Sequence, residues 1–323
     1  MSDVYCFGHV STGVILRLRD RFPQPDGYGE IAETLVNHAG EATGTALVLA
    51  RLGVAVSLEG NWIGDTPACR RTLEFLRSRG IDCSGLAVKP GYGGVNEIVI
   101  SDGASRTVFG RYCDLLFTTR QWEMPSVERI RAARIACVDP SFGEASLAVA
   151  REARAAGILL VTCDARPDSP LAQADAVILS NEMLGREFPD VVRSPEARAR
   201  CFGQYLERCP GLVVFTDGAR PLWYGRGRAC PAAPGRAEPG VRREMSPFPV
   251  EVVDSAGAGD SFRGGLIYGM LQDWSDADSL RFASAVSGLI CTTAPGCVNP
   301  PTLDEVCALL ARHHCSFHPA VRH

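Results

Sequence analysis

Short runs of apolar residues alternate along the chain with longer stretches that have helical periodicity. The apolar runs have the length of buried strands and lie at 135–138, 158–163, 176–179 and 212–215. The helical stretches lie at 40–52, 66–79, 144–156 and 195–208, and three of them stop at a glycine of the kind that caps a helix C-terminus: Gly53, Gly80 or Gly157. The alternation predicts an α/β fold in which a doubly wound, mostly parallel sheet carries helices on both faces.

Residues 86–112 follow a different pattern. Two β-prone runs, 95–101 and 106–109, are joined by Asp102-Gly103-Ala104-Ser105, and this predicts a β-hairpin. Together with the irregular, proline- and glycine-bearing segment at about 14–30, the region 88–112 would form a small β-sheet lid inserted in one domain that spans 1–323. The alternative is an ordinary edge hairpin of the main sheet. Lids of this kind exclude water from a reacting substrate.

Composition narrows the class of protein. A chain of 323 residues with a net charge of -4 has enough material for a buried core and carries no global electrostatic footprint for nucleic acid or an anionic membrane. Its 13 cysteines are odd in number and scattered, with no Cys-x-x-Cys spacing. The sequence also shows no signal peptide and no apolar run of bilayer length. We therefore expect reduced thiols and a cytoplasmic protein.

Single residues argue against several enzyme families. Lys89 is the only lysine, and it lies in neither a Walker A loop nor a protein-kinase pattern. Outside a histidine-bearing tail, for which we expect no functional metal, the chain contains His9 and His38 alone, and it has no Gly-x-Ser-x-Gly elbow, which disfavours a Ser-His-Asp hydrolase. Residues 225–247 are rich in glycine, proline and arginine, which predicts an exposed loop; arginines that face a polyphosphate are the alternative.

The segment 250–271 carries the clearest chemical signal. A predicted strand, Val250-Glu251-Val252-Val253, feeds a turn of small residues that opens into a helix running on to Leu271. Glycines at 257 and 259 let the backbone approach a ligand closely, and the amides of the first helical turn point outward with the positive end of the helix dipole. These features predict an anion site. The segment is not the dinucleotide fingerprint, because the third glycine, Gly264, comes too late.

Asp260 follows this turn directly. A carboxylate at the start of a phosphate-binding helix is electrostatically misplaced if binding is the whole purpose. If a phosphoryl group lies on the amides of residues 257–259, Asp260 is placed to accept the proton of an attacking hydroxyl while the amides stabilise the transferred charge. The alternative is an aspartate that merely caps its own helix.

The run Asp254-Ser255-Ala256-Gly257-Ala258-Gly259-Asp260-Ser261-Phe262-Arg263-Gly264-Gly265 resembles the C-terminal signature of the ribokinase-like (PfkB) carbohydrate kinases, Asp-Thr-x-Gly-Ala-Gly-Asp-x-Phe-x-Gly-Gly. It departs from that signature only at Ser255. The resemblance extends over nearly the whole chain, since Ala50-Arg51-Leu52-Gly53, Gly64-Asp65 and Thr216-Asp217-Gly218 look like further landmarks of the family. It implies a ribokinase-like fold.

The resemblance also implies a reaction centre. Asp260 would be the catalytic base, and the anion hole for the γ-phosphoryl group of ATP would consist of Gly257, Ala258 and Gly259. Asp254 would lie beside a monovalent cation such as K⁺.

On the nucleotide side, the resemblance implies a set of ATP-binding residues, namely Asn181, Thr216, Gly218 and Gly296. Mg²⁺ would neutralise the ATP phosphates, largely through water. The family's Asn-x-x-Glu motif is half present, because Leu184 stands where glutamate is expected; Glu182 or Glu187 would compensate. The alternative is that Asn181 simply caps the next helix.

The sugar side departs from the family. Its members open with Gly-x-x-Asn-x-Asp, but this chain reads Gly8-His9-Val10-Ser11-Thr12-Gly13, and the early Gly-Gly-x-x-x-Asn pattern loses its asparagine at Gly44. The acceptor pocket is left with four candidates: Ser11, Gly40, Arg111 and Asp139. Arg111, with Asp164-Ala165-Arg166-Pro167, resembles residues of 2-keto-3-deoxygluconate kinases, and the alternative for each is a structural or solvated side chain.

These observations predict an ATP-dependent kinase that phosphorylates an alcohol group of a sugar or sugar-acid substrate. A nucleoside kinase of the same fold is one alternative, and a catalytically silent sugar or nucleotide sensor is another. The intact Asp260 argues against the sensor, because a sensor needs no base. The resemblance further implies a homodimer formed through the exposed lid strands.

Overall fold

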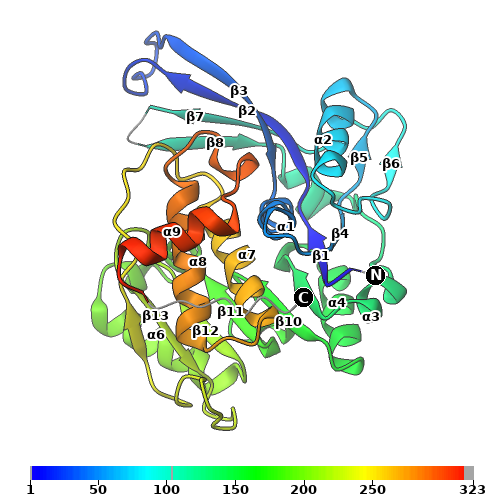
Figure 1. The fold of residues 1–323 in the computed structure, drawn as a ribbon. Helices are drawn as coiled ribbons and strands as arrows, with labels where there is room; N and C mark the ends of the chain where they lie inside the picture. Colours follow the sequence, from blue (N-terminus) through cyan, green and yellow to red (C-terminus); the bar gives the residue numbers. More distant parts are fainter. Residues whose placement is uncertain (1, 103–104, 316–323) are drawn as a thin grey trace.

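The computed structural model describes residues 2–102 and 105–315. Its centre is an eight-stranded sheet in the order β14-β13-β12-β11-β10-β9-β1-β4 (Figure 1). The six strands from β12 to β4 are parallel to one another. At the other edge, β13 pairs antiparallel with β12, and β14 pairs antiparallel with β13. The strands are β1 (Val4–Gly8), β4 (Val56–Gly60), β9 (Ile135–Val138), β10 (Leu159–Cys163), β11 (Ala176–Leu179), β12 (Leu212–Phe215), β13 (Leu222–Arg226) and β14 (Arg243–Met245). The predicted α/β fold with a mostly parallel sheet is confirmed.

Helices cover both faces of this sheet. One layer contains α1 (Glu41–Arg51), α2 (Pro67–Ser78), α7 (Ala258–Leu271), α8 (Asp276–Ile290) and α9 (Leu303–Arg312), and the other contains α3 (Val127–Ala132), α4 (Glu144–Ala155), α5 (Asn181–Glu187) and α6 (Pro195–Arg208). The two cores alternate along each strand: Val4 and Cys6 of β1 join the first, whereas Tyr5 and Phe7 join the second. This alternation is what a strand buried on both faces requires.

The predicted helix ends are present. Gly53, Gly80 and Gly157 follow α1, α2 and α4 closely with φ of 83°, 80° and 68°, a left-handed conformation that glycine adopts without steric penalty. Short helical turns complete the body: a π-helical turn at Asp114–Thr118 and 3-10 turns at Pro140–Phe142, Pro170–Gln173, Pro189–Val192 and Gly296–Val298. Within the described residues, none of the helices combines the length and the apolar character needed to cross a membrane.

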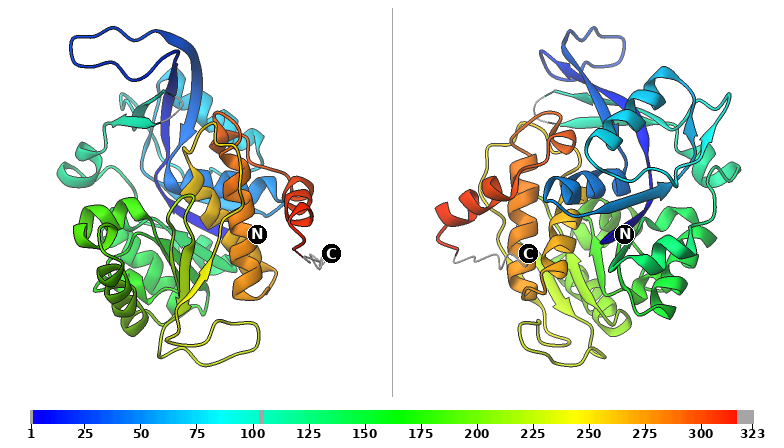
Figure 2. Two further views of the ribbon diagram at one scale, coloured as in Figure 1. Left: turned by 90° about the vertical axis from the view of Figure 1, so that its left-hand side faces the viewer. Right: turned by 45° about the vertical axis from the view of Figure 1, so that its right-hand side comes forward.

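A second, smaller sheet rises from one end of the body, as Figures 1 and 2 show. Its order is β3-β2-β7-β8, formed by β2 (Ser11–Leu18), β3 (Ile31–Ala39), β7 (Asn96–Ser101) and β8 (Arg106–Gly110). The expected hairpin is the antiparallel pair β7 and β8; part of its connecting loop, 103–104, lies outside the described residues. We call this four-stranded sheet the lid; β3 adds residues 31–39 to the segments expected from the sequence. A short pair, β5 (Ile63–Gly64) and β6 (Val88–Lys89), lies nearby.

The prediction of a strand at 250–253 is wrong. The backbone there pairs with no strand of the described chain. Instead, the N–H groups of Val253 and Asp254 donate to the carbonyl of Cys291, just beyond α8, at 2.7 and 3.2 Å. Val252 has an exposed fraction of 58%. The β-branched run therefore lacks the partner strand that its local preference would need.

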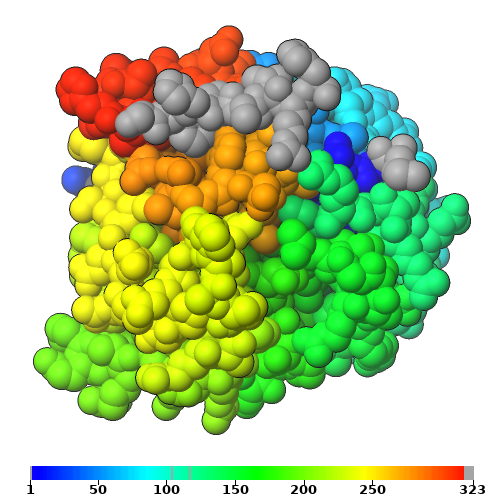
Figure 3. Space-filling model, turned by 60° about the horizontal axis from the view of Figure 1, so that its bottom comes forward, coloured from blue at the N-terminus to red at the C-terminus, as the bar shows by residue number. Residues whose placement is uncertain are grey.

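The loop expected at 225–247 is partly ordered and carries the edge strand β14. Arg226 contacts both carboxylate oxygens of the buried Asp276 at 2.8 Å, and Arg236 pairs with Asp273 at 2.7 Å. Figure 3 shows this region, in yellow, lying against the orange helices α7 and α8. Arg226 and Arg236 thus bind neighbouring carboxylates, and the alternative in which the loop faces a polyphosphate gains no support from them.

Candidate active site

The anion site is predicted at the turn before α7. Gly257 is the N-cap of α7 and has φ of 77°, so it is suited to glycine alone among common residues. A Cβ at this position would stand 2.5 Å from the Cβ of Cys297, because the turn at Gly296–Val298 packs directly behind it. The Ala258 N–H donates to the Ser255 carbonyl at 3.3 Å, and the N–H groups of Gly259 and Asp260 belong to the first helical turn, which offers no intrahelical acceptor.

Asp260 lies in this first turn and packs against α1. A Cβ added at Gly44 would stand 2.8 Å from Asp260 Cβ, and the Thr45 hydroxyl donates to the Asp260 carbonyl at 3.1 Å. Burial raises the pKa of Asp260 well above its ordinary value; Arg263 opposes this shift, and Glu41 adds to it. The carboxylate thus has a high affinity for a proton, which is the property a general base requires.

Arg263, which the sequence reasoning missed, is buried to 1% exposure on the same helix. Its Nη1 donates to Asp139 Oδ1 at 2.8 Å and to Cys163 Sγ at 3.0 Å, and its Nε donates to Thr45 Oγ1 at 2.8 Å. Its Nη2 is buried without a partner in the described part of the chain. The only signal in the sequence is a lone charge in the otherwise small and apolar helix 261–271.

Asp139 follows β9 and is completely buried. Its Oδ2 accepts the backbone N–H groups of His9 at 2.8 Å and Ala42 at 3.0 Å, while Oδ1 accepts from Arg263. A Cβ at Gly8 would overlap this carboxylate, at 1.9 Å from Oδ2. Asp139 therefore ties the end of β1 and the start of α1 to α7, and both of its oxygens are engaged by the protein.

Two predicted acceptor-side residues, Ser11 and Gly40, lie beside His9. Gly40 has φ of 115°, and a Cβ there would stand 2.2 Å from the His9 carbonyl oxygen. The His9 ring places Nδ1 at 3.8 Å from Glu41 Oε2 and 4.0 Å from Asp139 Oδ2. Burial lowers the pKa of His9, but these carboxylates outweigh it and leave the pKa raised. His9 Nε2 and Ser11 Oγ are buried without hydrogen-bond partners among the described residues.

The lid contributes a polar cluster that the sequence did not reveal. Asn37 Nδ2 donates to Glu97 Oε1 at 2.6 Å, and the Tyr112 hydroxyl donates to Glu97 Oε2. Cys297 Sγ lies 3.4 Å from Asn37 Oδ1 and so connects this cluster to the turn behind Gly257. Burial and the Glu97 carboxylate raise the pKa of Tyr112, which keeps its hydroxyl protonated as a donor.

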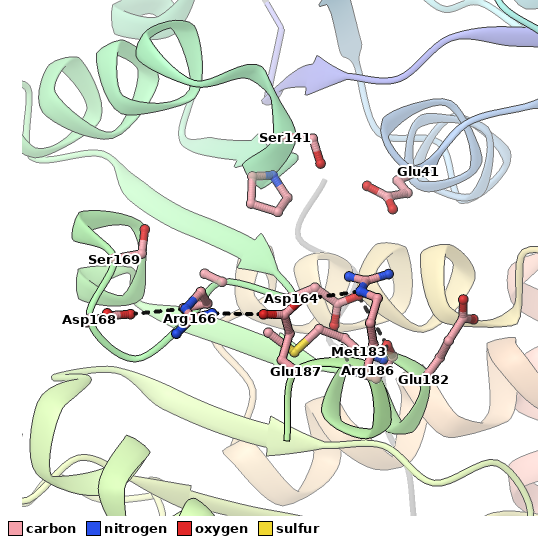
Figure 4. A pocket seen from close by; sticks show the side chains of 13 residues that line it. Glu41, Ser141, Asp164, Arg166, Asp168, Ser169, Glu182, Met183, Arg186 and Glu187 are labelled. Atoms are coloured by element: carbon pink, nitrogen blue, oxygen red, sulfur yellow. Dashed lines mark hydrogen bonds and ion pairs between the residues drawn. The ribbon is translucent and has the colours of Figure 1, made fainter. Parts of the chain in front are cut away.

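Arg111 and Asp164 make separate contacts. Arg111 is exposed just after β8, where its backbone N–H donates to the Asn96 carbonyl at 3.2 Å. Asp164 accepts from the N–H and the hydroxyl of Ser180 at 2.8 and 3.1 Å. It lines a cavity of about 540 Å³, shown in Figure 4, with Glu41 on one side and Glu182 and Arg186 on the other.

Three of the four predicted nucleotide-side residues, Asn181, Thr216 and Gly218, lie just after β11 and β12, whereas Gly296 lies in the turn Gly296–Val298 behind Gly257. Asn181 is not the helix cap, because the Ser180 hydroxyl accepts the Met183 N–H of α5 at 3.0 Å. Instead, Asn181 Oδ1 accepts from Arg198 Nη1 at 3.0 Å, and the same Nη1 lies 3.4 Å from Asp217 Oδ2. The alternative role of Asn181 as a cap is therefore wrong. Next to Asp217 in the chain are Thr216, whose hydroxyl donates to the Leu179 carbonyl at 3.3 Å, and Gly218 with φ of 59°.

The candidate metal ligands differ in whether their carboxylate oxygens already have partners in the protein. Glu187 is paired with Arg166 at 2.8 Å and with Arg186 at 3.4 Å, so its carboxylate is already engaged by two arginines. Glu182 is exposed and lines the same cavity. Asp254 is buried; its Oδ1 accepts the Ala256 N–H at 2.9 Å, and its Oδ2 has no partner in the described residues.

Comparison with known proteins places this site in a family. The chain matches the profile of the pfkB family carbohydrate kinases over residues 1–303. It belongs to this family and has its ribokinase-like fold.

The chain is 28% identical over 318 residues to an ATP-dependent ribose-1-phosphate kinase of Halopiger xanaduensis, covering 96% of this chain and 99% of the relative. It is 26% identical over 309 residues to a nucleoside kinase of Methanothermobacter thermautotrophicus, covering 94% of each. The crystal structure of a candidate ribokinase from Agrobacterium tumefaciens is similar with a TM-score of 0.82, at 24% identity, covering 97% of this chain and 98% of that chain.

Proposed function

We propose that the protein transfers the γ-phosphoryl group of ATP to an alcohol group of a sugar or sugar-like molecule. The observation that carries the proposal is the position of Asp260, whose carboxylate lies in the first turn of α7, beside free backbone amides, with a pKa that burial raises. A base and an anion-stabilising backbone at one helix N-terminus are the parts that phosphoryl transfer to an alcohol requires.

In the proposed step, the Asp260 carboxylate accepts the proton of the acceptor hydroxyl. The hydroxyl oxygen then forms a bond to the γ-phosphorus, while the bond from that phosphorus to the bridging oxygen breaks and ADP leaves with the electron pair. The amides at Gly257, Gly259 and Asp260 stabilise the charge on the transferred group. We assign no such role to the Ala258 N–H, because it is directed at Ser255.

The nucleotide would lie toward Asn181, Thr216, Gly218 and Gly296, as the family resemblance implies. Mg²⁺ bound to the ATP phosphates would neutralise their charge. Of the two predicted carboxylates, Glu187 is engaged in an ion pair, so we propose that Glu182, which lines the cavity, faces the metal. The buried, unpartnered Oδ2 of Asp254 suits a monovalent cation such as K⁺, because a buried carboxylate oxygen needs a donor or a cation.

Two acceptor classes follow from the relatives, whose names report action on ribose 1-phosphate and on nucleosides. We favour a sugar or sugar phosphate over a nucleoside, because the proposed acceptor side contains buried carboxylate, hydroxyl and imidazole groups at Glu97, Ser11 and His9. The silent-sensor alternative does not account for the free amides beside a base.

The lid also supports a homodimer. Its outer face exposes one apolar row across neighbouring strands, in which Val36, Val14, Ile98 and Phe109 are consecutive partners. Three of these, Val36, Ile98 and Phe109, have exposed fractions of 53%, 44% and 52%. A second copy of this row would bury them, and sedimentation velocity on the wild type and Ile98→Glu tests the assembly; a wild-type monomer would contradict it.

The test of the proposed function is ADP release with ATP and Mg²⁺ across D-ribose, D-fructose, ribose 1-phosphate, 2-keto-3-deoxygluconate and adenosine. Asp260→Asn is compared with the wild type, and Asp304→Asn, at an exposed position on α9, is the matched control. We expect at least one acceptor to drive turnover in the wild type and the control but not in Asp260→Asn, with ATP binding retained in all three. Acceptor-driven turnover that survives in Asp260→Asn would refute the assignment, as would silence of the wild type with every acceptor.

A further inference from the structure

The sugar side of the pocket lacks the aspartate that the family signature places at position 13, and the structure shows what fills its space. Gly13 lies in β2, directly between Glu97 of β7 and Asn37 of β3 in the lid. A Cβ on Gly13 would stand 2.4 Å from the Glu97 carbonyl oxygen and 2.7 Å from Glu97 Cγ. An aspartate cannot be accommodated there without movement, because both the Glu97 carbonyl and the Glu97 side chain stand too close to its Cβ.

Glu97 is held in place from both sides. Asn37 Nδ2 donates to Oε1 at 2.6 Å, and the Tyr112 hydroxyl donates to Oε2. The Tyr112 ring in turn needs a glycine at position 110, where a Cβ would stand 1.9 Å from the ring. Two glycines of one cross-strand row, Gly13 and Gly110, thus make room for one carboxylate and for the tyrosine that orients it.

The carboxylate also lies in the electrostatic neighbourhood of the reaction centre. Glu97 contributes to raising the pKa values of both His9 and Cys297, and Cys297 packs against Gly257 of the anion site. An ionised carboxylate accepts about four hydrogen bonds, and the described residues donate two to Glu97. Nearby, Ser11 Oγ and His9 Nε2 are buried and find no hydrogen-bond partner in the described part of the chain, which leaves polar groups that a bound ligand would satisfy.

We propose that Glu97 on β7 binds the acceptor, in place of the aspartate that the family signature has on β2. The inference rests on the proposed function and deepens it. A carboxylate accepts hydrogen bonds from hydroxyl groups and repels anions. The acceptor therefore presents a neutral, hydroxyl-bearing group to the lid, and any carboxylate or phosphate that it carries lies away from Glu97. Asn37 and Tyr112 are positioning residues for this carboxylate.

The experiment measures binding, so that it does not depend on turnover. The dissociation constants of D-ribose, D-fructose, ribose 1-phosphate, adenosine and gluconate are determined by calorimetry with a non-hydrolysable ATP analogue. The proteins are the wild type, Glu97→Gln and Tyr112→Phe, with Glu33→Gln, an exposed lid glutamate paired with Arg17, as the matched control. Thermal unfolding of each variant shows that it is folded.

We expect Glu97→Gln to weaken binding of the best hydroxylated acceptor by about 10- to 100-fold, the range for losing a hydrogen bond to a charged group. Tyr112→Phe should weaken it less, and Glu33→Gln should leave it unchanged. A structural role alone would not change selectivity among the hydroxyls of the acceptor. Each monodeoxy analogue of the best acceptor is therefore measured as well, and the analogue that binds more weakly to the wild type should bind Glu97→Gln as well as the parent does.

Equal affinity of the wild type and Glu97→Gln for every acceptor would overturn the proposal. So would a loss of affinity that is the same for the parent and all deoxy analogues, because it would indicate a general change of the lid. If none of the probes binds, Glu97 holds no such acceptor and the proposal fails. If hydroxyl-selective binding is found but no ADP is released in the kinase assay, the proposed function fails and the Glu97 assignment stands.

Discussion

Gly44 offers a steric test of how Asp260, the proposed base, is held. The residue lies within α1, where replacing glycine by alanine would ordinarily stabilise the helix by about 1 kcal/mol. Here, however, the new Cβ would stand 2.8 Å from Asp260 Cβ and 3.3 Å from Asp260 Oδ2. Non-bonded carbon atoms prefer about 3.5–4.0 Å, so α7 or the Asp260 side chain must move by roughly 1 Å. A displacement of that size at a reacting group lowers a rate by about 100-fold.

The prediction for Gly44→Ala is therefore a kcat about 100-fold below the wild type with an unchanged KM for ATP, and a free energy of unfolding lower by about 1–3 kcal/mol. Gly203→Ala is the matched control, because it lies inside α6 and a Cβ there meets no atom within 4 Å. The control should keep its kcat and gain up to about 1 kcal/mol. The assays are ADP release at saturating substrates and denaturant unfolding. A wild-type kcat in Gly44→Ala would refute the packing of the base against α1.

Three further predictions concern buried charges. Arg263→Met leaves the buried Asp139 without its counter-charge, so the free energy of unfolding should fall by about 3–5 kcal/mol in urea titrations, and an unchanged midpoint would contradict the pairing. Asp260→Asn should raise the Tm at pH 7, because burial raises the pKa of Asp260 above its ordinary value of 3.8 and the carboxyl therefore destabilises the folded state increasingly as the pH rises above 3.8. The gain should vanish as the pH falls toward 3.8, and a gain that persists there would exclude this cause. Burial, and to a smaller extent the charge of Arg71, lower the pKa of His38 from 6.5 to about 4. Between these pH values the unfolded state binds a proton that the folded state does not bind, so the free energy of unfolding should fall by up to about 3 kcal/mol between pH 6.5 and pH 4. His38→Gln should reduce this acid sensitivity in pH-dependent calorimetry, and an identical profile in the variant would argue against the assignment.

The parts of the fold that the sequence predicts are those set by local pattern. Apolar runs and helical periodicity identify the buried strands β9–β12 and the helices between them, because each pattern is read from neighbouring residues. The run at 250–253 shows the limit of this reasoning: its β-branched residues favour an extended backbone, but whether a strand forms depends on a partner strand, which is absent there. The signature around Asp260 is likewise local.

The proposed acceptor side is less predictable because it is built from residues that are distant in the sequence. Arg263 meets Asp139 across 124 positions of the chain, and Asn37 meets Glu97 across 60. In the sequence, Gly13 indicates only that the family's aspartate side chain is missing. In the structure, Glu97 Cγ stands 2.7 Å from where a Cβ on Gly13 would lie. A single sequence carries no signal for such an exchange, since the two positions become neighbours only when β2 and β7 pair in the lid.

The central claim is that Asp260 directs the γ-phosphoryl group of ATP to an alcohol. The most direct measurement is a single-turnover reaction with ATP labelled with ³²P at the γ-position and the acceptor that binds most tightly. The labelled products are separated into phosphorylated acceptor and inorganic phosphate. The account predicts that the wild type places the label on the acceptor and that Asp260→Asn leaves it on bound ATP. Label on the acceptor at the wild-type rate in Asp260→Asn, or label only in inorganic phosphate with the wild type, would contradict it.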